Sequence, residues 1–354
     1  MPLCMSAFHG SNAYIRESME QLIHFIRLSR PVNLAIIAIT MLVTRYMIIE
    51  PHLALTGKDN MLIMSTLDFG LLMLSTLLIA AGGYIINDYF DIRADRINKP
   101  EKVIVGKFIK RRIAMVVHTG FNTLAVIAGG YLSFKYETIW PLAIHFISTT
   151  LLWFYSLYFK RKILTGNLII AFLAWLTPML VALVELDLQQ EMYGGIMLDG
   201  IVYTPYNGME TATVFDDLLG ITWSMVIVFS TFAFLTNLVR EVIKDMADVE
   251  GDKHVGCRTL PIVLGMKNAR ITATGLILMI IGIIAALIFL VIPETEILMY
   301  TSVTILLPFI ASIYWVIKGN DRREFLRAGD FIKVAMLFGL GASFILFYYL
   351  NELV

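Results

Sequence analysis

The chain has 354 residues and a formal net charge of zero, yet 58% of its residues are hydrophobic and only 16% are charged. A soluble domain contains about 45–50% apolar and about 25% charged residues. The composition therefore excludes a soluble enzyme, a disordered chain, a fibrous repeat and a soluble nucleic-acid binder, and it predicts a polytopic membrane protein. Two cysteines, Cys4 and Cys257, are too few for a disulfide framework and have no metal-binding spacing.

The N-terminal segment, residues 1–30, lacks the unbroken apolar run of a signal peptide. From Tyr14 to Arg30, apolar residues such as Leu22 and Ile26 are mixed with charged residues such as Arg27. This pattern predicts an amphipathic helix that lies on the membrane surface.

Apolar stretches long enough to cross a bilayer follow along the rest of the chain, and a spanning helix needs about 20 mostly apolar residues. They are far longer than the strands of a membrane barrel and do not alternate. The sequence therefore predicts an all-α bundle of nine transmembrane helices, at 32–49, 67–87, 113–132, 139–159, 168–186, 219–239, 271–292, 297–317 and 331–350.

The basic residues are distributed very unevenly over the connections. With nine spans, 25 of the 28 Lys and Arg lie on one side, and the other three are Arg45, Lys58 and Lys135. The positive-inside rule makes the basic side cytoplasmic. The N-terminus is then cytoplasmic and the C-terminus extracytoplasmic. The longest outer connection, 187–218, has no Lys or Arg, and we interpret it as an extracytoplasmic surface insertion rather than a functional lid.

Two cytoplasmic connections each carry three acids with the spacing i, i+3, i+7, namely Asp88, Asp91 and Asp95 after the second span and Asp245, Asp248 and Asp252 after the sixth. On a helix that continues out of the membrane, this spacing places the carboxylates on one face. Each acid of the second set follows its counterpart by 157 residues. The pattern indicates two four-helix repeats facing each other within one domain, 1–354, with a cytoplasmic cap of loops and short helices.

Six carboxylates at the membrane boundary repel one another unless a cation lies among them. Oxygen ligands without His or Cys favour Mg²⁺ or Mn²⁺ over zinc, and Mg²⁺ is commonly shared with substrate phosphates. Basic residues in the same loops complete a diphosphate site. Two other interpretations are a pair of solvated loops of mixed charge and an ion or proton pathway, but the acids of a pathway usually lie at mid-membrane rather than at span ends.

The two acidic motifs and the segments around them resemble the UbiA family of intramembrane prenyltransferases. The resemblance rests on the NDxxDxxxD motif that begins at Asn87, on Arg30-Pro31-Val32-Asn33 before the first span, and on the N-xx-RE-xx-KD-xx-D-x-EGD pattern that begins at Asn237. The last pattern is typical of the branch that contains digeranylgeranylglyceryl phosphate synthases, chlorophyll synthases and homogentisate prenyltransferases. The resemblance covers the chain from about residue 30 to residue 350.

The resemblance implies transfer of an isoprenyl group from a polyprenyl diphosphate, such as geranylgeranyl diphosphate, to a lipophilic acceptor. It implies two Mg²⁺ ions, with Mn²⁺ as an alternative, held by Asp91, Asp95, Asp248 and Asp252 with help from Asn87, Asp88 and Asp245. Residues expected to bind the diphosphate or the substrates are Arg30, Asn33, Lys99, Lys102, Lys160, Lys162, Arg240, Lys244, Lys253 and Arg258. Residues expected to stabilise the allylic cation or to position the acceptor are Tyr84, Trp153 and Tyr155.

The preferred acceptor is a prenylglyceryl phosphate, for whose phosphate Arg240, Lys162 and Arg258 are candidates. An aromatic quinone precursor of the homogentisate, hydroxybenzoate or naphthoate type is the alternative, and a transporter is the more remote one. We expect the donor, the acceptor and membrane lipid as partners, no nucleic acid and no obligate protein partner.

Overall fold

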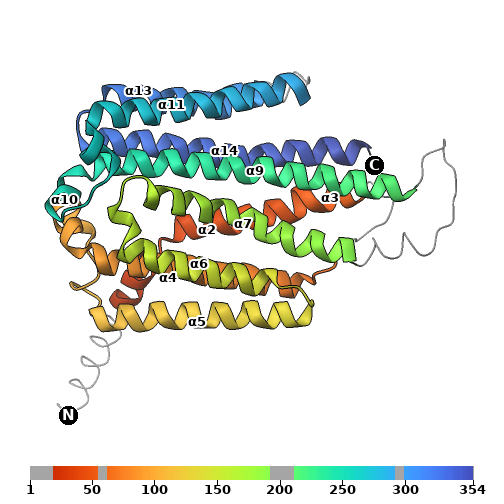
Figure 1. Cartoon of the computed structure of the whole chain (residues 1–354), viewed down its shortest axis with the longest axis horizontal. Coiled ribbons are helices and arrows are strands. Elements are labelled where there is room, and N and C mark those ends of the chain that lie inside the picture. The colour runs from red at the N-terminus through yellow and green to blue at the C-terminus, as the bar shows by residue number, and fades with distance from the viewer. Residues whose placement is uncertain (1–18, 55–61, 192–210, 292–298, 354) are drawn as a thin grey trace, which may run out of the picture.

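The computed structural model of the chain describes residues 19–54, 62–191, 211–291 and 299–353, and these residues form a bundle of helices without a β-strand (Figure 1). The all-α prediction is confirmed. The first half contains α2 (Pro31–Val43), a π-helical turn (Thr44–Ile49), α3 (Glu50–Ala54), α4 (Thr66–Asn98), α5 (Arg111–Lys135) and α6 (Trp140–Leu157). The second half contains α7 (Thr165–Gln189), α9 (Thr211–Ala247), α10 (Val249–His254), α11 (Leu260–Val291), α13 (Leu307–Lys318) and α14 (Arg322–Leu353).

Within the described residues, seven helices are long and apolar enough to cross a membrane: Pro31–Ile49, Thr66–Asn98, Arg111–Lys135, Thr165–Gln189, Leu219–Ala247, Leu260–Leu287 and Thr301–Lys318. They match seven of the nine predicted spans. The other two predicted spans, 139–159 and 331–350, coincide with α6 and α14. Each predicted segment is thus helical where it is described, while the count of nine membrane crossings stays a prediction.

Local chemistry explains where the helices that carry the site begin. Pro31 occupies the first turn of α2, where its missing N–H costs no hydrogen bond. The residue before it, Arg30, has a left-handed backbone with φ 53°. Ser65 caps α4 by accepting a hydrogen bond from the backbone N–H of Asp68 at 3.1 Å. Gly265, with φ 82°, breaks the helical geometry near the start of α11.

Two buried apolar clusters hold the bundle together. One includes Met41, Leu72, Leu180 and Val226, from α2, α4, α7 and α9, and the other joins α9 to α11, α13 and α14. Large apolar side chains also cover the outside of the bundle, as at Leu67 and Phe134, which are 88% and 87% exposed. Soluble proteins rarely carry apolar surface on this scale, so the chain is an integral, multi-pass membrane protein.

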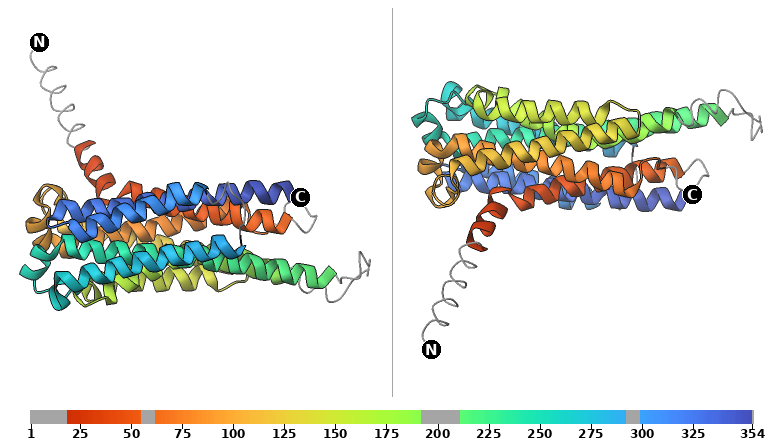
Figure 2. Two further views of the ribbon diagram at one scale, coloured as in Figure 1. Left: turned by 90° about the horizontal axis from the view of Figure 1, so that it is seen from above. Right: turned by 90° about the horizontal axis from the view of Figure 1, so that it is seen from below.

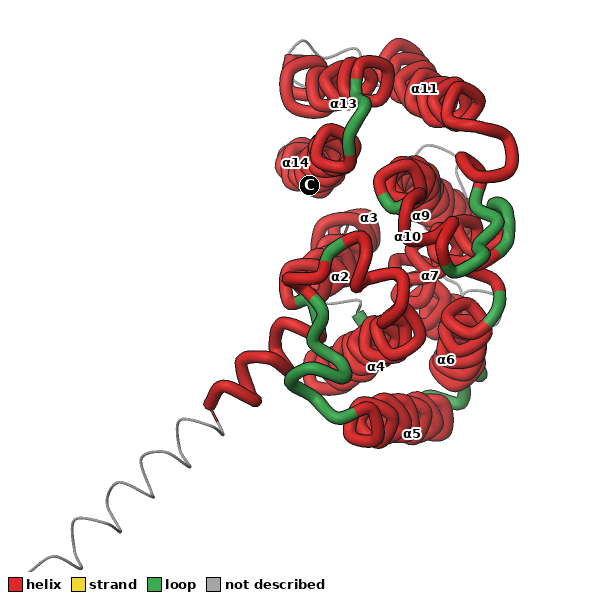
Figure 3. Tube along the Cα trace, turned by 90° about the vertical axis from the view of Figure 1, so that its left-hand side faces the viewer, coloured by secondary structure: helices red, strands yellow, loops and turns green. Residues whose placement is uncertain are grey.

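The acidic motifs lie at one end of the bundle, at the left of Figure 1, where α4 and α9 end and α10 begins. Figure 3 views the bundle from this end. The described N-terminal helix, 19–28, projects from the same end, whereas α14 finishes at the opposite end (Figure 2). The rest of the predicted amphipathic segment and residues 192–210 of the predicted insertion lie outside the described residues.

Candidate active site

The first acidic motif occupies the last turns of α4, which runs unbroken through all three acids as expected. Asn87 and Asp95 are buried, and the side-chain amide of Asn87 donates a hydrogen bond of 2.7 Å to Asp91. Each acid has a basic partner: Arg30 lies 2.5 Å from Asp88, Lys160 contacts Asp91, and Lys99 lies 3.2 Å from Asp95.

The second motif departs from the prediction of one continuous helix. The helix α9 ends at Ala247, and Asp248 (φ −103°, ψ 9°) precedes the separate short helix α10. Asp245 accepts a hydrogen bond of 2.9 Å from the side chain of Asn167, and Asp248 pairs with Arg322 at 3.2 Å. The three acids therefore do not share a single helical face. Asp252 lies in α10 and is turned toward α4 because α10 packs there.

The helix α10 is fastened to the end of α4 by reciprocal hydrogen bonds. The side-chain amide of Asn98 donates to the backbone oxygen of Asp248 at 3.0 Å, and the backbone N–H of Gly251 donates to the side-chain oxygen of Asn98 at 2.9 Å. A Cβ atom on Gly251 would lie 2.5 Å from the Asn98 amide nitrogen and 2.7 Å from the backbone oxygen of Ala94. Only glycine fits this approach, so the glycine of the second motif serves to bring the two motifs together.

A polar pocket lies between the motifs. Asp91 and Asp252 both line it, together with Lys160 and exposed Arg93 and Arg96. Burial would lower the pKa of Lys160, but the negative charges of Asp91 and Asp252 hold it well above its usual value. Burial raises the pKa of Asp252 to about 6, and nearby Asp248 and Asp91 add to this effect against the opposing influence of Lys160. The pocket thus contains a charged Lys160 paired with Asp91, and a second carboxyl, Asp252, whose charged form is disfavoured by burial.

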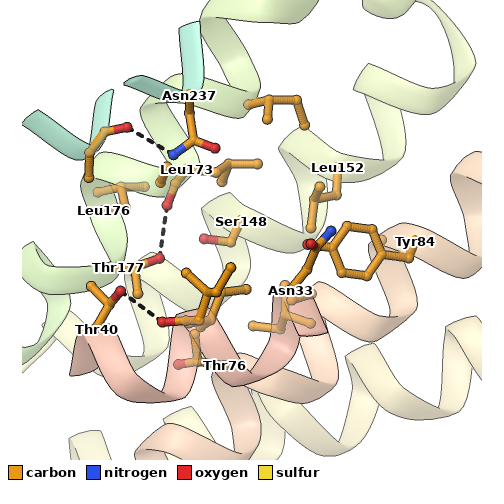
Figure 4. Close-up of a pocket in the computed structure, with 18 of the residues that line it drawn as sticks. Asn33, Thr40, Thr76, Tyr84, Ser148, Leu152, Leu173, Leu176, Thr177 and Asn237 are labelled. Carbon is orange, nitrogen blue, oxygen red and sulfur yellow. Dashed lines mark hydrogen bonds between the residues drawn. The ribbon is translucent and has the colours of Figure 1, made fainter. Parts of the chain in front are cut away.

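An apolar cavity extends from this end into the membrane-spanning part of the bundle (Figure 4). Arg30, Asn33, Tyr84 and Asn87 line its entrance. Polar side chains also line the wall, and four of them donate hydrogen bonds to their own helices. Thr40, Thr76 and Thr177 donate to the backbone oxygens four residues earlier, at 2.8, 2.8 and 3.1 Å, and the amide of Asn237 does so at 2.9 Å. The wall therefore suits an apolar chain despite these residues.

The donor set fits Mg²⁺. Among the described His, Cys, Asp and Glu residues, no three lie close enough together to hold a metal ion in this structure. Asp91 and Asp252 nevertheless face one pocket, and a positively charged group, Lys160, already lies against Asp91. Carboxylate and amide oxygens are the ligands that Mg²⁺ prefers. A divalent cation in this pocket would offset the burial and the neighbouring acids that raise the pKa of Asp252.

The structure brings many of the sequence-predicted residues together. Arg30, Asn33, Tyr84, Tyr155, Arg240 and Lys244 line the apolar cavity, and Lys160 lines the polar pocket. Other predicted residues line neither the cavity nor the polar pocket. Lys99 pairs with Asp95, and Lys162 lies 3.9 Å from the ring centre of Tyr158. Trp153 packs against His118, and the remaining three are exposed: Lys102, Lys253 and Arg258.

Sequence reasoning missed several residues at this end of the bundle. Glu241, between Arg240 and Lys244, lines the cavity and pairs with both at 3.3 and 3.1 Å. The last helix, α14, contributes Lys333 to the cavity and Arg322 to Asp248. The positive-inside rule predicts a cytoplasmic position for both, but no sequence motif marks them.

A helical membrane bundle with two acidic motifs joined above an apolar cavity has the architecture expected of an intramembrane prenyltransferase. The model of the UbiA prenyltransferase family matches residues 53–351, and the chain belongs to this family. It is therefore a prenyltransferase, as the resemblance of its motifs implied.

Similar proteins point to one branch of the family. The chain is 29% identical over 325 residues to the digeranylgeranylglyceryl phosphate synthase of Methanothermobacter thermautotrophicus, covering 88% of this chain and 92% of that protein. It is 28% identical to the protein of the same name from Thermococcus kodakarensis, covering 78% and 84%.

Solved structures share the fold. A digeranylgeranylglyceryl phosphate synthase in membranes has a TM-score of 0.57 at 22% identity, covering 92% of this chain and 98% of that chain. A UbiA homologue from Archaeoglobus fulgidus bound to GPP and Mg²⁺ has a TM-score of 0.58 at 16% identity, covering 92% and 99%.

Proposed function

We propose that this prenyltransferase transfers an isoprenyl group from an allylic diphosphate, such as geranylgeranyl diphosphate, to the hydroxyl group of a prenylglyceryl phosphate. The observation that carries the proposal is the fastening of the second acidic motif onto the first, through Asn98 and Gly251, directly above an apolar cavity. A diphosphate held between the motifs would leave its isoprenoid tail in that cavity. The names of the relatives support the acceptor.

We assign the diphosphate to the polar pocket. Asp91, Asp95, Asp248 and Asp252, with Asn87, Asp88 and Asp245, would hold two Mg²⁺ ions there, with Mn²⁺ as a substitute. Bound Mg²⁺ supplies positive charge to the oxygens of the leaving diphosphate. Lys160 would move from Asp91 to the diphosphate, because its high pKa keeps it charged. Arg30 is paired with Asp88 and lies 4.8 Å from the ring centre of Tyr84, and it would reach the diphosphate from the cavity side.

The reaction breaks the bond between C1 of the donor and its diphosphate oxygen. A new bond forms between C1 and the acceptor hydroxyl oxygen, and the hydroxyl proton passes to the departing diphosphate. The buried cavity wall excludes water from the allylic carbon while this exchange occurs. The ring of Tyr84 at the entrance offers a π face to the developing positive charge.

A phosphorylated acceptor suits the charge at the cavity entrance. Arg30, Arg240, Lys244 and Lys333 line the cavity against a single acid, Glu241. Lys162 and Arg258, the other two candidates for the acceptor phosphate, are exposed and line neither pocket. An aromatic quinone precursor remains the second candidate, because Tyr84 and Tyr155 lie at the same end.

We further propose that the end of the bundle that carries the motifs is cytoplasmic, with the C-terminus on the other side. The 25 Lys and Arg of the predicted cytoplasmic segments support this orientation.

The test uses purified protein in detergent micelles with Mg²⁺, geranylgeranyl diphosphate and one acceptor at a time: geranylgeranylglyceryl phosphate, homogentisate, 4-hydroxybenzoate or 1,4-dihydroxynaphthoate. Mass spectrometry identifies the product. We expect an ether product with the first acceptor only and its loss with EDTA. A prenylated aromatic product would replace the acceptor assignment, and EDTA-resistant turnover would contradict the metal assignment.

A further inference from the structure

The apolar cavity has a closed lower end. Ile144 of α6 and Leu176 and Leu180 of α7 line the cavity and also belong to the buried apolar cluster beneath it, with exposures of 6%, 7% and 2%. Residues deeper in the same cluster, such as Val184 and Val226, are 1% and 0% exposed and do not line the cavity. Ile144, Leu176 and Leu180 therefore form its floor.

Three helices give the same depth for the cavity. The first and last lining residues are eleven residue steps apart on α4, from Asn87 down to Thr76. The same holds on α6, from Tyr155 to Ile144, and on α9, from Lys244 to Ala233. At a rise of 1.5 Å per residue, each of these distances along the helix axis is about 16 Å. The agreement between helices from both halves of the chain means that the cavity ends at one level.

This depth corresponds to a definite isoprenoid length. Each isoprenyl unit adds four carbon–carbon bonds of about 1.5 Å, and bond angles reduce its extended length to roughly 5 Å. A chain whose first carbon lies at the level of Asn87 would then reach the floor with three to four units. A chain of six or more units would overrun the floor by about 14 Å or more.

We infer that Ile144, Leu176 and Leu180 set the chain length of the donor, limiting it to three to four isoprenyl units. The inference rests on the proposed function, in which the diphosphate lies between the acidic motifs and the donor tail enters the cavity below. Donor lengths of 15 and 20 carbons fit, and the chains of six to nine units are excluded by packed side chains rather than by charge. Thr76 and Thr177 also line the cavity, but they are compatible with an apolar chain because their hydroxyl groups donate hydrogen bonds to backbone oxygens of their own helices.

The experiment presents diphosphates of two, three, four, six and nine isoprenyl units to the full-length protein. Binding is measured without acceptor, as the rise in melting temperature with Mg²⁺ and each diphosphate, since a ligand that binds the folded state stabilises it. Turnover is measured as kcat/KM with the acceptor. We expect the three- and four-unit donors to be preferred over the six-unit donor by about tenfold or more.

Floor variants sharpen the test. Leu180→Ala and Ile144→Ala should each improve the six-unit donor relative to the four-unit donor by about tenfold, and Leu180→Phe should shift preference from four units to three by a similar factor. Leu186→Ala is the matched control: Leu186 lies on the same helix, is 1% exposed and does not line the cavity. It should lower the melting temperature and leave the chain-length profile unchanged.

A wild-type profile that is flat from four to nine units would overturn the inference, because the tail would then leave sideways into lipid. So would floor variants whose profiles match that of Leu186→Ala. Chain-length-dependent binding without product from any acceptor would support the floor and contradict the proposed reaction, which keeps the two failures distinct.

Discussion

The backbone N–H of Gly251 donates a hydrogen bond of 2.9 Å to the side chain of Asn98, a residue 153 positions earlier in the chain. Through this contact the second acidic motif is attached to the last turn of the helix that carries the first. The site therefore depends on the close approach of α10 to the end of α4, and any group that separates these two helices should disrupt both motifs together.

Gly251→Ala tests this dependence. The added Cβ would lie 2.5 Å from the Asn98 amide nitrogen and 2.7 Å from the oxygen of Ala94, so α10 must move away from α4. Overpacking of this kind costs about 1–3 kcal/mol. We expect kcat/KM to fall about 100-fold, with a melting temperature only a few degrees lower. Gly120→Ala on α5, where a Cβ meets nothing within 4 Å, should be fully active, and equal activity of the two variants would contradict the role of Gly251.

Much of this architecture was predictable from the sequence, for local reasons. Apolar length identified the helices, and the run of α4 through Asp88, Asp91 and Asp95 followed from helical spacing. The break at Asp248 was not predictable, because α10 turns toward a partner on α4 that is distant in sequence. The contributions of Arg322 and Lys333 were also missed, since they depend on where α14 packs.

Asp91→Asn tests the contact between Asp91 and Lys160. Removing one member of an ion pair leaves the other charge without compensation, which costs about 3 kcal/mol for a well-buried pair and less for these partly exposed side chains. We expect turnover to fall about 1,000-fold and the free energy of unfolding to decrease. The double variant Asp91→Asn/Lys160→Met should regain stability without regaining activity. Recovery of turnover in the double variant would mean that Asp91 serves only to neutralise Lys160.

The raised pKa of Asp252 predicts a pH dependence of stability in EDTA. Its folded pKa of about 6 lies above its ordinary value of 3.8, so the folded state binds more protons than the unfolded state between these values. Asp252 should therefore make the stability of the metal-free protein fall as pH rises from about 4 to about 6. Asp252→Asn should show a shallower decline than the wild type over this range, as measured by melting temperature against pH. Identical pH profiles for the two proteins would contradict the assignment.

The affinity for Mg²⁺ should depend on the same carboxyl group, that of Asp252. Unlike the stability of the metal-free protein, this affinity should increase as pH rises. Mg²⁺ binds the carboxylate and not the acid, so binding releases a proton wherever Asp252 is protonated. We expect the Kd for Mg²⁺, measured by calorimetry, to be constant above about pH 7 and to rise about tenfold per pH unit below pH 6. The Asp252→Asn variant should bind Mg²⁺ more weakly and with a shallower dependence on pH. A wild-type Kd that is unchanged between pH 5 and pH 8 would argue that Asp252 is not a ligand.

Arg322→Gln tests whether α14 positions the second motif. Arg322 lies 3.2 Å from Asp248, at the point where α9 ends. Because it touches Asp248 and no predicted substrate group, its loss should act through the metal. We expect the apparent KM for Mg²⁺ to rise about tenfold, with a smaller change in kcat at saturating Mg²⁺. Arg322→Lys should restore part of the affinity, and Arg323→Gln, at the exposed neighbouring position, should change neither parameter. A fall in kcat that saturating Mg²⁺ does not relieve would instead place Arg322 among the groups that contact the diphosphate.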